Sequence, residues 1–277
     1  YWHCRRGRPK AAAFGRQFEF VYAKGRETMR KLYEKYEVTF SLIWIAAYVV
    51  LFSVADSVSE SLGIYKIITV PVGILLSLIL YIWIRRNKLM EKYGLCRFKG
   101  SPKNYLFFIP LAVIMTTNLW NGVKMNVSVG ETILHVISMI CVGFIEEIIF
   151  RGLLFKAIGK SNVIRAFVIT SITFGIGHIV NLIRGADFIS TCLQMCYAIA
   201  IGFLFAVIFY KGKSLLPCII AHATINVLSI FAVQRSRMFD IIVAVVMCVV
   251  SAAYGAWLLR FGYNIEKSTG MDDMGSE

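Results

Sequence analysis

The chain has 277 residues, of which 58% are hydrophobic, and a formal net charge of +14. A soluble domain is typically about 45 to 50% apolar, so this composition excludes a soluble globular protein and predicts an integral membrane protein. The basic residues lie between apolar runs, and no Gly-rich phosphate loop is present, so we expect no nucleic-acid partner.

Residues 1–38 form a basic N-terminal segment that precedes the first long apolar run. The chain starts at Tyr1, and we interpret Met29 as the natural start, with the residues before it as an upstream extension or a fragment of something larger. A helix that crosses a bilayer needs roughly 17 to 25 mostly apolar residues. Runs of about this length occur at Thr39–Val58, Ile64–Ile84, Tyr105–Trp120, Ile133–Leu154, Val163–Ile183, Phe188–Tyr210, Leu215–Val233 and Ile241–Phe261. The third run is the shortest. The pattern predicts an all-α, polytopic membrane bundle of about eight transmembrane helices.

The charges between these runs predict how the chain is threaded through the membrane. Lys and Arg crowd the N-terminal segment, the Arg85-to-Lys103 loop, the Arg151-to-Arg165 loop, and positions Lys211 and Lys213. The alternate loops carry few. By the positive-inside rule we expect a multi-pass protein of the cell membrane with both termini in the cytoplasm. One pair is an exception, because Arg235 and Arg237 fall on a predicted outer loop.

Three groups of polar residues interrupt the apolar runs. An ionisable side chain near the bilayer centre costs at least about 2.5 to 3.5 kcal/mol, so these residues need partners inside the bundle and usually mark a function. In the second and third groups the outer residues are one helical turn apart and share a face. The groups are Glu146-Glu147 with Arg151, Phe174 with His178, and His222 with Asn226.

The spacing within these groups predicts a division of roles. Glu147 and Arg151 are spaced i, i+4, so the guanidinium can reach the carboxylate. Glu146 projects about 100 degrees away and is free to face a cavity, where a carboxylate can accept a proton from water. An imidazole and an Asn amide, as in His222 and Asn226, are suitable donors to an oxyanion. Taken singly, each group is also typical of structure: an ion-pair clasp, a buried histidine or interhelical hydrogen bonds.

The ordered motifs Glu-Glu-x-x-x-Arg, Phe-x-x-x-His and His-x-x-x-Asn resemble those of the CPBP (CAAX protease and bacteriocin-processing, or Abi) family of intramembrane proteases. The resemblance covers roughly residues 133 to 233. It implies a hydrolase that cleaves a peptide bond near a membrane-associated substrate terminus. We therefore expect a catalytic core at 131–234, preceded by N-terminal transmembrane helices at 39–130 and followed by the last transmembrane helix and a cytoplasmic tail at 235–277.

By position, the resemblance implies roles for six residues. Glu146 activates water, Glu147 and Arg151 support it, His178 is its partner, and His222 and Asn226 stabilise the oxyanion. No cofactor is expected, because the chain lacks a His-Glu-x-x-His pair and Asn is a poor zinc ligand. In the alternative zinc mechanism, the ligands would be Glu146, His178 and His222.

Two alternatives to proteolysis remain at this stage. One is a non-catalytic bacteriocin-immunity or membrane scaffold protein, and the other is a small transporter with a carboxylate–histidine proton relay. The transporter is disfavoured because no inverted repeat is visible. The expected partners are the lipid bilayer and a peptide or protein substrate. We expect a cytoplasm-facing cavity, although His178 lies about fifteen residues into an outward-running helix.

Overall fold

The computed structural model describes residue 25 and residues 27–261. In chain order its elements are α2(Glu37–Ser61), α3(Thr69–Arg86), η1(Pro102–Phe108), α4(Ile109–Thr116), η2(Thr117–Leu119), α5(Val129–Glu147), η3(Ile148–Phe155), α6(Lys156–Gly159), α7(Val163–Ile176), η4(Gly177–Ile179), α8(Val180–Ile183), α9(Phe188–Gly212), α10(Leu216–Ser229) and α11(Arg237–Phe261). The prediction of an all-α membrane bundle is confirmed. The interpretation of Met29 as the natural start concerns residues 1–24 and 26, which lie outside the described residues.

Every predicted apolar run contains a helix, but the helices differ in length. Among the described residues, six helical stretches are long and apolar enough to cross a membrane, at Glu37–Ser61, Thr69–Arg86, Val129–Gly159, Val163–Ile183, Phe188–Gly212 and Arg237–Phe261. The third and seventh runs form the shorter helices Ile109–Leu119 and Leu216–Ser229. Each of these has a proline in its first turn, Pro110 and Pro217, where a missing N–H breaks no helical hydrogen bond.

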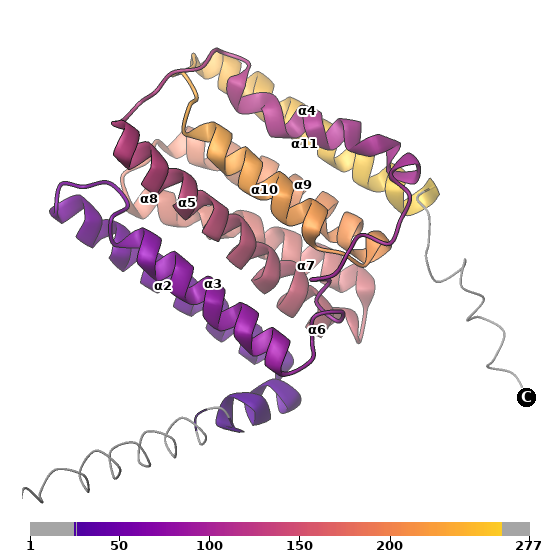
Figure 1. The fold of residues 1–277 in the computed structure, drawn as a ribbon. Coiled ribbons are helices and arrows are strands. Elements are labelled where there is room, and N and C mark those ends of the chain that lie inside the picture. The colour runs from indigo at the N-terminus through magenta and orange to yellow at the C-terminus, as the bar shows by residue number, and fades with distance from the viewer. Residues whose placement is uncertain (1–24, 26, 262–277) are drawn as a thin grey trace, which may run out of the picture.

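The helices pack in two layers. In one layer α3 packs on α5, α5 on α10, and α10 on α4, whereas behind it α7 packs on α9 and α9 on α11 (Figure 1). Helix α2 packs on α3 and on the segment η3. Apolar side chains also cover outward faces, as on α3, where the exposed residues are Ile74, Leu75, Leu78, Ile79 and Ile82. Such a face suits contact with lipid rather than water.

Side-chain caps begin several helices where the apolar runs start. Ser128 and Glu131 form a reciprocal capping box at the start of α5, which satisfies two backbone N–H groups. Asp187 caps α9 by accepting from the Ser190 N–H, and it also pairs with Arg237 at the start of α11. The Arg237 guanidinium and the Ser190 N–H hold the pKa of Asp187 well below its usual range. The ionised Asp187 therefore ties α9 to α11.

The predicted fourth run is not a uniform α-helix. After Glu147 the helix widens into the π-helical segment η3, and α6 then completes a helical stretch that extends to Gly159. All eight residues of η3 are buried, including Arg151. Stretches of π-helix are rare and occur frequently at functional sites. The polar motif thus lies at a change of helical geometry that the apolar pattern does not reveal.

Candidate active site

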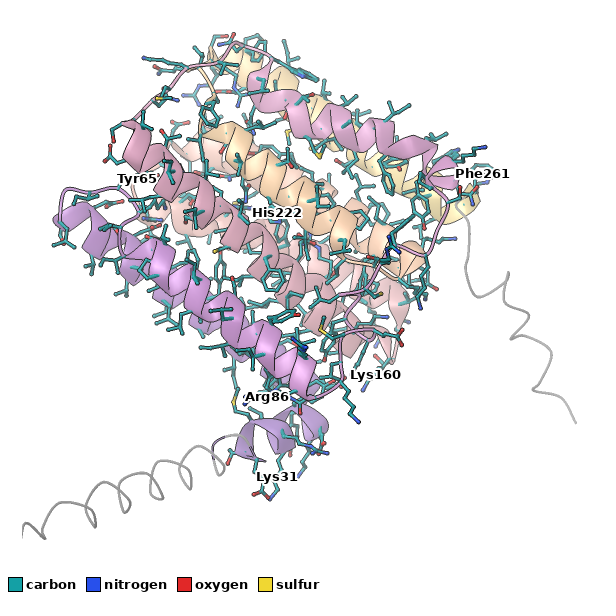
Figure 2. The ribbon with its side chains drawn as sticks, in the orientation of Figure 1. Lys31, Tyr65, Arg86, Lys160, His222 and Phe261 are labelled. Carbon is teal, nitrogen blue, oxygen red and sulfur yellow. The ribbon has the colours of Figure 1, made fainter. Side chains whose placement is uncertain are left out.

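The three motifs come from three separate parts of the bundle and converge at its centre. Glu146 and Glu147 end α5, the Phe174 motif spans the end of α7 and the short helix η4, and His222 lies in α10. Figure 2 shows His222 midway between the two ends of the bundle. Helices α5 and α10 approach closely at Gly143, where an added Cβ would lie 2.8 Å from the backbone N of Ala223. This contact sets the α10 motif beside the α5 carboxylates.

A buried ion pair forms one side of the site. Arg151 Nη1 donates to Glu147 Oε1 at 2.9 Å, and the two side chains are 1% and 0% exposed. His222 Nδ1 lies 2.8 Å from the same carboxylate oxygen. Because that oxygen already accepts from a guanidinium, we assign Nδ1 as the donor in this contact. Glu147 therefore holds Arg151 and orients the His222 ring.

Aromatic rings enclose the Arg151 guanidinium. Its carbon Cζ lies 4.1 Å from the ring centre of Phe174 and 5.5 Å from that of Phe205. Gly202 leaves room for it, since an added Cβ there would lie 3.4 Å from Arg151 Nη2 and 3.3 Å from the Phe174 ring. Cation–π contacts of this kind are worth about 2 kcal/mol or more when desolvated. Phe174 thus packs on the charged centre, as expected for a supporting residue.

Glu146 has a different environment from Glu147. Its side chain is 14% exposed, and Oε1 accepts a hydrogen bond from the Tyr48 hydroxyl at 2.6 Å. Its second oxygen, Oε2, lies 3.6 Å from His222 Nε2, which is beyond a normal hydrogen bond. One oxygen is therefore held in place and the other has room to contact a water molecule. The two neighbouring carboxylates are differentiated in the way that their spacing predicts.

A cavity of about 350 Å³ joins the three motifs. Its lining includes Glu146 from α5, His178 from η4 and Asn226 from α10. The His178 ring packs edge-on against Phe174, with ring centres 5.7 Å apart. No hydrogen bond joins the His178 ring to another residue in the part of the chain that the structure describes. His178 can therefore bind a water or a substrate in the cavity.

All six predicted site residues thus lie in or beside one centre, but the structure adds residues that the sequence does not indicate. Tyr48, on α2, is the direct partner of Glu146. His135 lines the same cavity and contacts Tyr65 through an edge-on ring pair. The cavity also reaches an ionic cluster centred on Asp56. The only sequence signal for these residues is a polar group inside an apolar run.

The alternative zinc mechanism needs three converging ligands. Within residues 27–261, no group of three or more His, Cys, Asp or Glu side chains is arranged to hold a metal ion. His222 directs Nδ1 to Glu147 and keeps Nε2 for a ligand, which is the usual arrangement of a metal-bound histidine. Because Glu146, His178 and His222 do not form such a group among the described residues, we derive no catalytic step through a metal. The described cysteines are free thiols.

Comparison with known proteins identifies the segment that contains the site. Residues 128–228 match the family model described as type II CAAX prenyl endopeptidase Rce1-like. The match extends from the start of α5 almost to the end of α10 and includes all three motifs. The resemblance to CPBP-family intramembrane proteases is therefore confirmed for this segment. A search of curated proteins finds no significant match to the chain.

Proposed function

We propose that the chain is an intramembrane endopeptidase that hydrolyses a peptide bond near a membrane-associated substrate terminus, with Glu146 as the base that activates water. The observation that carries this proposal is the shared cavity of Glu146, His178 and Asn226, three residues from three motifs on three elements. The match of residues 128–228 to a prenyl endopeptidase family supports the same reaction class.

Glu146 is the residue best placed to take a proton from water. The Tyr48 hydroxyl fixes Oε1, so Oε2 can accept from a water molecule in the cavity. The water oxygen then attacks the peptide carbonyl carbon while its proton passes to Glu146. His178 faces the same space and can position the water. The proton on Glu146 is later delivered to the leaving amine as the C–N bond breaks, so no co-reactant besides water is required.

The tetrahedral oxyanion needs donors, and Asn226 supplies an amide from the cavity wall. His222 can supply a second donor only in one protonation state. Because Nδ1 donates to Glu147, a neutral ring carries no hydrogen on Nε2, whereas the imidazolium carries one on each nitrogen.

Glu147 and Arg151 act through other residues rather than on the substrate. Both are fully enclosed, and Glu147 touches His222. The pair thus serves as a positioning unit for the oxyanion donor, and it confines the charged groups to a network that the bundle can bury.

The test is peptide cleavage by purified protein in detergent. Wild type and Glu146→Gln would be incubated with a peptide mixture that includes prenylated C-terminal peptides, and products would be identified by mass spectrometry. We expect wild type to cleave and Glu146→Gln to lose cleavage while it keeps the wild-type melting temperature. The matched control is Glu91→Gln, which removes an exposed carboxylate outside the cavity. Equal cleavage by wild type and Glu146→Gln would remove Glu146 from the mechanism.

A further inference from the structure

The two ends of the bundle differ in charge. One end carries the start of α2, the loop after α3, α6, and the end of α9; Lys31, Arg86 and Lys160 lie there in Figure 2, and Tyr65 lies at the opposite end. The stretch from Arg85 to Lys103, which runs from the end of α3 into η1, contributes seven basic residues. By the positive-inside rule, this basic end faces the cytoplasm.

The opposite end holds fewer basic residues among those described, and ion pairs engage most of them. Lys66 and Arg184 both contact Asp56, at 2.8 and 2.6 Å. Arg235 pairs with Asp240 and Arg237 pairs with Asp187. The two arginines that disagreed with the predicted alternation of charge are therefore held by local carboxylates. Their presence at this end does not reverse the orientation that the basic loops indicate.

The catalytic cavity extends toward this second end. Along α2 its lining runs from Tyr48, beside Glu146, to Asp56, which is eight residues and about 12 Å along a helix axis. It continues to Lys66 in the loop after α2, to Arg184 after α8 and to Ser229 at the end of α10. Arg184 and Ser229 are exposed, so the cavity reaches the surface there.

No such route leads to the basic end. Beyond Glu146 the chain enters η3, whose residues are all buried. Glu37 then bridges Lys92 and Lys160, at 2.7 Å each, and ties α2 to the basic loop and to the turn after α6. In the part of the chain that the structure describes, none of the cavity-lining residues comes from η3, from α6 or from the loop after α3.

We propose that substrates and water reach Glu146 from the non-cytoplasmic face of the membrane. The sequence predicts both cytoplasmic termini and a cytoplasm-facing cavity, but in this fold the cavity opens at the end opposite to the basic loops. Because the distribution of basic residues supports cytoplasmic termini, we give up the expectation of a cytoplasm-facing cavity. The depth of His178 follows from the same geometry, because His178 lies on the cavity's path to the outer end. If the proposed proteolysis holds, this direction of entry assigns a substrate class, which is a peptide segment presented at the outer membrane surface.

The cavity wall suits such a route. Beyond the catalytic residues, its side chains include Ser53, Asn181, Gln194 and Ser229, so a peptide backbone and water can be hydrogen-bonded along the way. Asn181 donates to Gln194 at 2.9 Å across the wall. Polar side chains at membrane depth face the bundle interior or a water-filled cavity, and these four line the cavity.

Cysteine accessibility tests the direction of entry without requiring proteolysis. Ser53→Cys lies within the cavity, Ser229→Cys at its mouth, and Ser161→Cys on the exposed turn at the basic end, so the three variants are matched in chemistry. A membrane-impermeant maleimide would be applied to spheroplasts of a bacterial host and to inverted vesicles, and labelling would be measured above that of wild type.

We expect labelling of Ser53→Cys and Ser229→Cys in spheroplasts, and labelling of Ser161→Cys only in inverted vesicles. The reverse pattern, or labelling of Ser53→Cys only in inverted vesicles, would overturn the proposal. A second arm separates access from chemistry: a peptide that purified wild type cleaves is added outside spheroplasts that express wild type or Glu146→Gln. If purified wild type cleaves no peptide while the outer labelling holds, the proteolysis fails and the direction of access stands.

Discussion

Breaking the buried ion pair should be the most destabilising single change in the site. Arg151→Met keeps an unbranched side chain of similar length between Phe174 and Phe205, so little packing is lost. It does leave the Glu147 carboxylate, which is 0% exposed, without its guanidinium. At 2.9 Å and an effective dielectric constant of about 20, the Coulomb energy of the pair is about 6 kcal/mol. Removing one partner of a buried pair costs about 3 to 5 kcal/mol.

A loss of this size is measurable as melting in detergent, followed by circular dichroism. For a chain of this length about 1 kcal/mol corresponds to roughly 2 to 4 °C, so we expect a decrease of roughly 6 to 20 °C. The double variant Glu147→Gln/Arg151→Met removes both charges and keeps an oxygen acceptor for His222. We expect it to recover most of the melting temperature while cleavage stays impaired. A single Arg151→Met variant that melts within about 2 °C of wild type would refute the buried-pair argument.

Three further outcomes are expected. Tyr48→Phe removes the hydroxyl that donates a hydrogen bond to Glu146. Since a hydrogen bond to a charged group is worth about 1.5 to 3 kcal/mol, kcat should decrease about tenfold or more. An unchanged kcat would contradict a role for the hydroxyl. Gly143→Ala places a Cβ 2.8 Å from the Ala223 backbone, so it should lower the free energy of unfolding by about 1 to 3 kcal/mol and also reduce activity. The control is Gly130→Ala on the same helix, where an added Cβ has no neighbour within 4 Å, and this variant should melt as wild type does. A chelator should leave the activity of purified protein unchanged; inactivation that added zinc reverses would replace the proposed base with a metal-bound water.

The polar motifs could be located from the sequence because charge inside an apolar run is costly and therefore informative. Their i, i+4 spacing also predicts the pairing of Glu147 with Arg151, and the structure contains that pair. The separate environment of Glu146 follows from the same helical geometry. These conclusions depend only on neighbours along one helix and on the requirement that buried charges have partners.

Other features depend on contacts between distant segments, which one sequence does not record. Tyr48 is 98 residues from Glu146, and a tyrosine in an apolar run is ordinary in composition. The π-helical segment could not be predicted because all of its residues are buried, so no apolar face gives a period. The direction of the cavity depends on which residues of α2, α8 and α10 line it, which is a property of packing alone.

The π-helical segment also limits how this chain can vary. A π-helical turn accommodates more residues per turn than an α-helix, so η3 shifts the register of everything after Glu147. Deletion of one residue between 148 and 155 could restore regular α-geometry locally, but it would turn the following residues by about 100 degrees and rotate Arg151 or α6 away from its neighbours. Homologous or designed sequences that preserve this site should therefore keep the residue count across this segment unchanged, even where they replace its apolar side chains freely.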